Sequence, residues 1–241
     1  MSVLTIAQNV AQETGFTSPS ALVGSADENA IQLLALIKKE TRALSDRYQW
    51  NKLIVRGTFD FVDAQESYPL PVDFKDFIQK TIWNYTTRRP LIAPITAEDY
   101  EIQKNYLITS GIDKMVRVYD GQMHITPVPS STDTINYEYT TLNIYQSSLG
   151  AGKPDITVDT DTTTIREFIV ELGVKLRFLV AKGLVTPAEL EKSFEKKDYD
   201  MQVENAILTD GFGSKNPINM SSRVNAFWMG AYTQDSNFPS V

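Results

Sequence analysis

Cysteine is missing from this sequence altogether, and histidine occurs once, as His124. Without cysteine the chain cannot form disulfides, ligate zinc or iron–sulfur clusters through thiolates, or use a thiol nucleophile. With one histidine it cannot build a metal site from several imidazoles. These two absences exclude several classes of metalloprotein and every thiol-dependent enzyme.

Positive charge is also scarce. The 241 residues include 23 Lys and Arg against 30 Asp and Glu, which gives a formal net charge of −7. Proteins that grip nucleic acid by its phosphates are usually basic, so this balance argues against a DNA-binding module. No stretch approaches the roughly 18 consecutive apolar residues of a membrane span, and we expect no membrane partner. The first residues do not resemble a secretory signal, which favours a protein made in a cytoplasm or built into a particle there.

Hydrophobic periodicity divides the chain into helical ends and a β-rich middle. A period near 3.6 predicts helices at about 3–14 and 28–50, and the same period returns after residue 163. The middle favours β-branched and aromatic residues in near-alternation, which is typical of strands. Asp120-Gly121 between two such runs predicts a two-residue hairpin turn, because both residues tolerate positive φ. The expected strands are 53–62, 78–85, 115–119, 122–126 and 134–145, with a short helix at 97–105.

The second helical region carries clear start signals. Thr164 and Glu167 form a capping-box pattern. Thr186 and Glu189 form another, with Pro187 at the first helical position between them. Two long helices with a tight connection predict an antiparallel helical hairpin. The expected apolar face of its second helix consists of Leu190, Phe194, Met201 and Leu208.

These elements predict an α+β fold in which helices and strands are segregated. The two ends of the chain would pack together as one α-helical body, and the β part would project from it. The expected division is a helical body of residues 1–51 and 162–211, a β-rich insertion at 52–146, a linker at 147–161 and an extended C-terminal arm at 212–241.

The linker contains three closely spaced carboxylates, Asp155, Asp159 and Asp161. Hard cations bind clustered carboxylates, so a small carboxylate- and metal-dependent enzyme is one alternative. The spacing lacks the glycine and the final glutamate of an EF-hand loop. The pattern therefore favours a solvated linker over a metal site.

Other polar candidates stand alone. His124 lies on the outgoing strand of the predicted hairpin, where no serine or carboxylate forms a recognisable catalytic frame with it. Arg88 and Arg89 could touch phosphate, but no larger basic cluster accompanies them. We therefore expect no enzymatic activity and no catalytic, cofactor-binding or metal-ligating residues.

The last segment is rich in Gly, Pro, Ser and Asn and has little charge, yet it is also aromatic. Disordered tails are usually poor in aromatic residues. Such a segment either folds back on its own domain or docks on a partner. Aromatic side chains dominate the binding energy of protein interfaces, so the aromatic content favours docking over folding back. Its aromatic residues are Phe212, Phe227, Trp228, Tyr232 and Phe238.

Three segments stand out by their order. They are Tyr-x-Trp at 48–50, which ends the second helix, YPLPVDF at 68–74, and IWNYTTRRPL at 82–91. The opening LTIAQNVAQETGF precedes them, and the helical hairpin with its TDG ending follows. A chain with these segments in this order resembles the head-to-tail adaptor (connector or neck) proteins of tailed dsDNA bacteriophages, particularly the short-tailed type. The similarity covers about residues 3–212.

The resemblance implies a structural role in the virion. Such adaptors form a ring, commonly of twelve copies, beneath the portal at the capsid vertex, where they extend the DNA channel and dock the tail. The expected partners are the portal protein, a tail nozzle or tail-tube protein, and further copies of this chain. Genomic DNA would pass through the channel without specific binding. The expected location is the neck of the virion, at the head–tail junction, after synthesis in the cytoplasm of a bacterial host.

In similar proteins the helical body contacts neighbouring subunits, the β part tends to face the tail, and C-terminal segments reach the portal. Phe212, Phe227, Trp228 and Tyr232 are therefore the expected portal-binding residues. A different tail component, such as a tail-tube or baseplate protein, remains the alternative within the same class.

Overall fold

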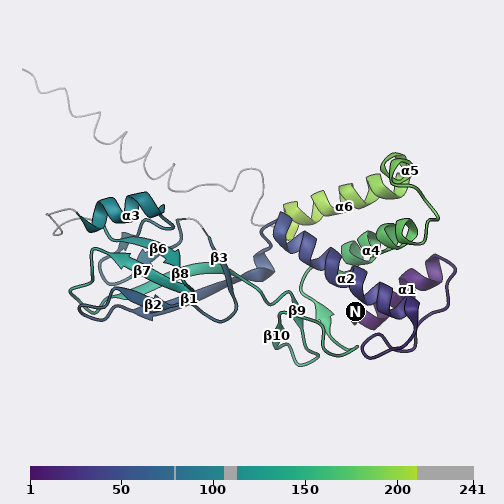
Figure 1. Cartoon of the computed structure of the whole chain (residues 1–241), viewed down its shortest axis with the longest axis horizontal. Coiled ribbons are helices and arrows are strands. Elements are labelled where there is room, and N and C mark those ends of the chain that lie inside the picture. Colours follow the sequence, from purple (N-terminus) through teal and green to yellow (C-terminus); the bar gives the residue numbers. More distant parts are fainter. Residues whose placement is uncertain (79, 106–112, 211–241) are drawn as a thin grey trace, which may run out of the picture.

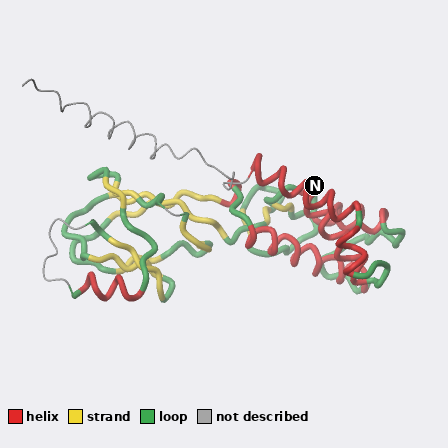
Figure 2. Tube along the Cα trace, turned by 90° about the horizontal axis from the view of Figure 1, so that it is seen from above, coloured by secondary structure: helices red, strands yellow, loops and turns green. Residues whose placement is uncertain are grey.

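The computed structural model describes residues 1–78, 80–105 and 113–210. Helices gather in one part of the molecule and most strands in the other, and the two parts lie end to end (Figures 1 and 2). The sheets are antiparallel throughout. The predicted α+β fold is confirmed. The predicted arm, 212–241, lies outside the described residues.

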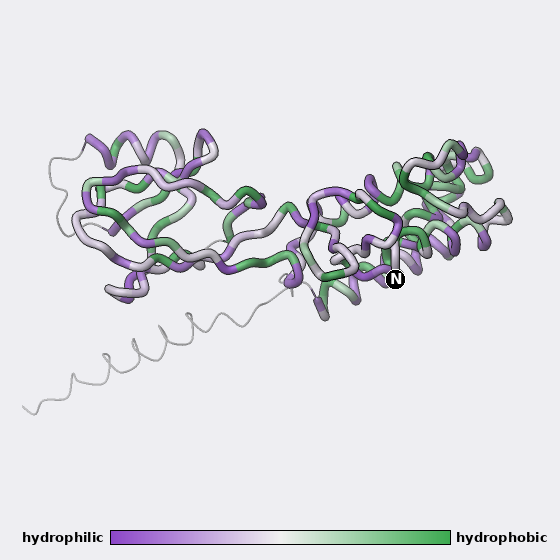
Figure 3. The backbone as a smooth tube through the Cα atoms, turned by 90° about the horizontal axis from the view of Figure 1, so that it is seen from below, coloured by the Kyte–Doolittle hydropathy of each residue, from purple (hydrophilic) through white to green (hydrophobic). Residues whose placement is uncertain are grey.

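The helical part, called the body below, is built from both ends of the chain. One continuous cluster of buried side chains runs from Val3 to Ala206. Hydrophobic and hydrophilic residues are interspersed along the tube in both parts of the molecule (Figure 3). The elements of the body are α1 (Val3–Glu13), α2 (Glu28–Arg47), η1 (Asn51–Leu53), β9 (Tyr145–Gln146), β10 (Gly152–Lys153), β11 (Thr162–Thr163), α4 (Glu167–Ala181), α5 (Pro187–Lys192) and α6 (Phe194–Asp210).

Local signals explain where the first two helices begin and end. The Ser2 hydroxyl caps α1 and the Asp27 carboxylate caps α2, each by accepting a backbone N–H of the first turn. The predicted second helix, 28–50, is three residues too long. Trp50 instead turns back into the core, where its indole N–H donates to the carbonyl of Leu44 at 3.0 Å. The same carbonyl also accepts the backbone N–H of Tyr48 at 3.3 Å, so the Trp50 indole adds a second donor at the end of the helix.

The inserted part, called the β lobe below, contains two antiparallel sheets. β8 is the central strand of the larger sheet, with β1 along one side and β3 and β4 along the other. The smaller sheet has the order β2-β7-β6. The elements are β1 (Ile54–Asp60), β2 (Ser67–Pro69), β3 (Phe74–Phe77), β4 (Trp83–Asn84), β5 (Arg89–Pro90), α3 (Ala97–Lys104), β6 (Met115–Tyr119), β7 (Gln122–Thr126) and β8 (Thr134–Thr141).

A second, separate cluster of buried residues joins the two sheets of the β lobe. Ile135 and Tyr137 of β8 meet Met123 and Ile125 of β7 in this cluster. The predicted Asp120-Gly121 turn between β6 and β7 is confirmed, with φ of 52° and 67°. The positive φ values match the twist of the two strands.

Residues 147–161, predicted as a linker, belong to the body instead. Lys153 and Gly152 form β10 and pair with β9. Ile156 is buried in the body cluster, and Asp161 has no solvent exposure. Their Gly-, Ser- and Asp-rich surroundings indicated a solvated loop. Here the aspartates accept backbone N–H groups of the segment itself and of the loop after α1, and Asp155 pairs with Lys38 of α2.

The helical hairpin begins differently from its predicted pattern. α4 starts after Arg166, and Thr164 is buried without capping the helix. The Thr186–Glu189 capping box at α5 is confirmed, with Pro187 at the first helical position. The predicted single second helix divides at Ser193, whose backbone is extended and whose hydroxyl accepts the N–H of Lys196 at 3.1 Å.

Candidate interaction surfaces

The predicted portal-binding residues, Phe212, Phe227, Trp228 and Tyr232, lie outside the described residues. The described residues place candidate surfaces on the body and on the β lobe.

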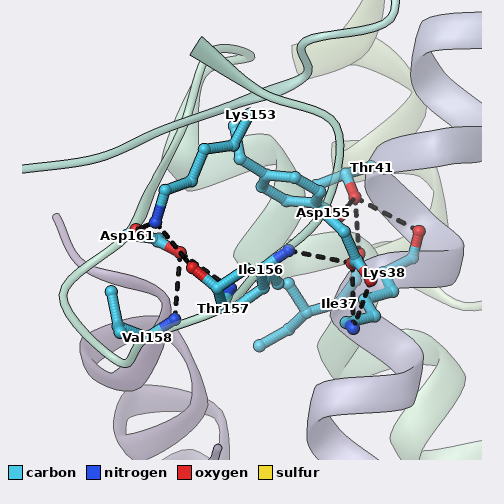
Figure 4. Close-up of polar contacts among 10 residues, drawn as sticks. Ile37, Lys38, Thr41, Lys153, Asp155, Ile156, Thr157, Val158 and Asp161 are labelled. Atoms are coloured by element: carbon cyan, nitrogen blue, oxygen red, sulfur yellow. Dashed lines mark hydrogen bonds and ion pairs between the residues drawn. The ribbon is translucent and has the colours of Figure 1, made fainter. Parts of the chain in front are cut away.

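Asp161 is a structural residue at the edge of the body. Its carboxylate accepts the ammonium of Lys153 and the backbone N–H groups of Thr157 and Val158 at 2.8 to 3.1 Å (Figure 4). Burial raises the pKa of this carboxyl, but these donors together outweigh burial and leave the pKa below its ordinary value. The Lys153 ammonium already supplies a positive charge beside this buried carboxylate.

The other two aspartates of the predicted cluster turn elsewhere. Asp159 accepts the backbone N–H groups of Leu22 and Val23, which ties the loop after α1 to this segment. Asp155 pairs with Lys38 of α2 at 2.8 Å (Figure 4). The structure does not bring the three carboxylates together. Within residues 1–78, 80–105 and 113–210 no group of three or more His, Asp or Glu side chains could hold a metal ion.

His124 stacks on an aromatic ring of the neighbouring strand. Its imidazole lies 3.7 Å from the ring of Tyr119, centroid to centroid, at 14° between the planes. The Arg117 guanidinium covers Tyr119 at 4.5 Å. Burial lowers the pKa of His124, and the positive charges of Arg117 and Lys104 add to this, against the opposing effect of Glu66. His124 Nε2 is buried with no hydrogen-bond partner in the described part of the chain, which does not fit a general base oriented by a second group.

Of the two predicted arginines, Arg88 lines a hollow on the larger sheet and Arg89 does not. Arg88 adopts a positive φ of 57° in the turn after β4, and Arg89 begins β5. The hollow has a volume of about 300 Å³ and opens beside Arg56, Trp83, Tyr85 and Arg88. Trp83 and Tyr85 are 45% and 69% exposed. Arginine, tryptophan and tyrosine are the residue types most enriched among energetic hot spots of protein interfaces.

Glu40 is the buried polar centre of the body. The carboxylate, 1% exposed, accepts the Tyr199 hydroxyl of α6 and the Arg177 Nε–H of α4. Burial raises the pKa of Tyr199, and its hydrogen bond to Glu40 raises it further. α2, α4 and α6 therefore meet at one charged hydrogen-bond network. Beside it opens a groove of about 530 Å³, which Lys39, Arg47, Arg177 and Lys196 line together with apolar side chains.

The outer side of α6 was misassigned from the sequence. Of the predicted apolar face, Phe194, Met201 and Leu208 are 81%, 52% and 57% exposed, and Leu190 alone is partly buried. The helix instead buries Tyr199, Val203 and Ala206. At 3.6 residues per turn the two sets lie on opposite sides of the helix. α6 thus has two apolar faces, one in the core and one exposed, and we call Phe194, Met201 and Leu208 the outer stripe of α6.

α2 carries a second exposed surface of different character. Ile31 is 52% exposed, and Ala35 and Arg42 are exposed on the same side of the helix. The opposite side of α2 buries Leu33, Ile37 and Leu44. The exposed Glu28 lies one turn before Ile31, and Lys39 and Arg42 lie two to three turns after it, so this surface, called the outer face of α2, is small and carries charges of both signs.

Comparison with protein-family models and with curated proteins finds no match for this chain. In the described part of the chain, none of the helices combines the length and the apolarity needed to cross a membrane.

Proposed function

We propose that this chain is a structural virion protein, a head-to-tail adaptor of a tailed dsDNA bacteriophage. In this proposal its copies form a ring, commonly of twelve, beneath the portal. The ring extends the DNA channel and docks the tail nozzle or tail tube. The protein is not an enzyme in this account, and its site is a set of contact surfaces.

The outer stripe of α6 carries this proposal. Scattered exposed apolar residues are normal on a soluble protein. Three large apolar side chains in line, on a helix whose opposite side already fills the core, are instead typical of a surface that another protein covers. A body that needs further protein to cover its helices is what a ring subunit requires.

The division of the molecule supports the same proposal. The body and the β lobe each have their own buried cluster, and they lie end to end (Figure 1). One part can contact neighbouring copies while the other meets a different protein. The net charge of −7 suits a channel through which DNA slides, because phosphates are not held by an acidic protein.

Sedimentation with the portal protein of the same phage tests the proposal. The mass of the chain is measured alone, then after mixing with portal. We expect the mixture to contain portal with a stoichiometric ring of this protein. Removal of residues 213–241 is expected to abolish portal binding and leave the circular dichroism spectrum of the folded domain unchanged.

A finer variant pair tests the predicted anchors. Phe227→Ala, Trp228→Ala and Tyr232→Ala together are expected to abolish portal binding, because aromatic anchors dominate interface energy. The matched control changes Ser221, Ser222 and Thr233 of the same segment to alanine and is expected to bind normally. Unimpaired binding by the truncated protein overturns the anchor assignment.

The second candidate is a tail-tube or baseplate component, which the same exposed stripe also suits. It predicts rings or tubes that form without portal. A wild-type chain that self-assembles and ignores portal overturns the adaptor proposal in favour of this one. A chain that stays monomeric with portal present overturns both.

A further inference from the structure

We infer that Lys75 is a latch that holds the β lobe in one direction relative to the body. When the latch opens, the lobe pivots on a hinge formed by the two places where the chain crosses between the two parts. The inference concerns the movement of the two parts against each other, and it does not rest on the proposed function.

The first crossing passes from the body to the lobe within one residue. Leu53 has no solvent exposure and belongs to the buried cluster of the body. Ile54, the next residue, begins β1 and pairs with Thr140 of β8. The backbone of Ile54 is extended, so a single strand of chain joins the two parts here.

The second crossing is equally short and lies beside the first. Asn143 is tied to the lobe, because its side-chain amide donates to Asp73 at 3.2 Å. The carbonyl of Ile144, the next residue, accepts a backbone N–H of the body at 3.0 Å. Since Ile54 pairs with Thr140 near the end of β8, the two crossings run side by side. A few residues at the ends of elements are enough to form a hinge between two packed parts.

Apolar packing does not bridge this junction. The body and the β lobe have separate buried clusters, and among the described residues neither cluster includes members of both parts. A cavity of about 180 Å³ lies at the junction, lined by the end of α2, by Lys75 and by the second crossing. The direction of the lobe therefore depends on polar contacts across the junction.

Lys75 of β3 makes such a contact with the end of α2. Its ammonium donates to the carbonyl of Ser45 at 3.0 Å and to the carboxylate of Asp46 at 2.5 Å. Ser45 lies in the last turn of α2, where carbonyls lack a partner within the helix and the helix dipole favours positive charge. Among the hydrogen bonds and ion pairs between described residues, only these two join a side chain of the lobe to a helix of the body.

An irregularity in the pairing of β3 places Lys75 at this point. Phe74 pairs with Thr141 and Asp76 pairs with Thr140, so Lys75 is an extra residue with no partner on β8. An extra residue of this kind bends its strand and re-aims its side chain. The position of the latch is therefore set by the backbone of the lobe.

The latch is weak enough to open while both parts stay folded. The side chains of Lys75 and Asp46 are 26% and 59% exposed. Ion pairs this exposed contribute little net stability, and salt screens them further. Because each part has its own buried cluster, the lobe can change direction without disturbing the packing of the body.

Pulsed EPR between two spin labels measures the direction of the lobe, and the chain has no cysteine that would interfere. Ala35→Cys attaches one label to α2 and Val62→Cys attaches the other to the β lobe, both at exposed positions. For the full chain at low salt we expect one narrow distribution of distances. Addition of Lys75→Met is expected to shift the mean distance and to broaden the distribution at least about twofold, because the hinge then bends freely.

Matched variants separate the latch from general loosening. Lys75→Arg is expected to keep the narrow distribution, because a guanidinium can donate to the same two acceptors. Asp46→Asn keeps the carbonyl contact but removes the charge, so an intermediate width is expected. Lys38→Met removes an ion pair of the same helix that lies wholly within the body, and it is expected to change nothing. Circular dichroism and urea unfolding verify that each labelled variant keeps its fold.

Salt gives a second measurement that needs no further substitution. About 1 M NaCl shortens the screening length to roughly 3 Å. The distribution of the latched chain is then expected to broaden toward that of Lys75→Met, whereas the distribution of Lys75→Met is expected to stay as it is.

Two results would overturn the inference. Equal distributions with and without Lys75→Met at low salt would show that other contacts fix the lobe. Equal broadening by Lys38→Met would show that the labels report loosening of α2 and not a latch. Both measurements use the chain without portal, so their outcome leaves the adaptor proposal to its own test.

Discussion

Gly173 of α4 lies directly against the carboxylate of Glu40 on α2, so closely that a methyl group on Gly173 would overlap Oε1. The glycine is in mid-helix, where it costs about 1 kcal/mol of helix stability relative to alanine. Because Gly173 has no side chain, the Glu40 carboxylate can reach both Tyr199 and Arg177. A buried carboxylate that keeps both partners explains why a helix-weakening residue occupies this position.

Gly173→Ala is therefore expected to destabilise the protein, against the helix-propensity rule. Alanine would contribute about 1 kcal/mol, but crowding of a fixed buried group costs about 1–3 kcal/mol. We expect a net loss, seen as a lower midpoint in urea unfolding. In a Glu40→Ala background the same change should be neutral or stabilising, because the carboxylate is gone. Equal effects in both backgrounds would contradict the assignment.

Asp161→Asn is expected to cost about 2–3 kcal/mol at pH 7, since a buried charged acceptor loses its pairing with Lys153. The folded-state pKa of Asp161 lies below its ordinary value. Its contribution to stability is thus complete above the unfolded pKa and is lost as pH falls through the lower folded pKa. Urea unfolding of wild type and variant should differ most at neutral pH and converge below about pH 4. Asp155→Asn, whose carboxylate is half exposed, is the control and should change stability by less than about 0.5 kcal/mol.

His124→Phe should remove the pH dependence of the unfolding free energy near neutral pH. The phenyl ring should keep the stack with Tyr119. Burial lowers the pKa of His124 in the folded chain, so the unfolded chain takes up a proton first as pH falls. Wild-type stability should decline relative to the variant as pH drops below about 6.5. Because the chain has one histidine, the difference between their unfolding free energies over pH 5–7.5 isolates this group. Parallel curves would show that imidazole protonation is not coupled to folding.

Trp83→Ala with Tyr85→Ala should separate tail docking from ring formation, if the β lobe faces the tail as the resemblance to phage adaptors implies. Both rings are substantially exposed, so folding should be affected little. We expect rings on portal in normal number and a loss of tail-protein binding of more than about tenfold. Val72→Ala, at a fully exposed position of the same lobe, is the control. Loss of rings instead would place this surface between copies of the chain.

Local patterns predicted much of the fold. The Asp120-Gly121 hairpin, the short helix after Thr96 and the capping box at Thr186 were all read from a few neighbouring residues, and the structure has each of them. These features depend on turn and cap chemistry that nearby residues determine. The separation of helical ends from a β-rich middle followed from a change of hydrophobic period.

Features that depend on distant partners were missed. The outer stripe of α6 and the buried set Tyr199, Val203 and Ala206 are both apolar, and periodicity alone does not say which side faces the core. The seven-residue spacing of Phe194, Met201 and Leu208 was the available signal for a separate stripe. The hollow beside Arg56 and Trp83 was also missed, because cross-strand pairing brings those residues together from separate strands.

The attachment of the chain's start to residues 159–161 has a consequence for synthesis. Val3 and Leu4 donate their N–H groups to the carbonyls of Asp161 and Asp159, and Asp159 also holds the loop at Leu22. α1 therefore cannot complete its contacts until more than 150 further residues have left the ribosome. The strands of the β lobe pair over shorter separations in sequence. The β lobe can therefore fold before the first two helices have all their contacts. α1 and α2 are thus translated before the β lobe but complete their contacts after it, and chaperone binding during translation should centre on these two helices.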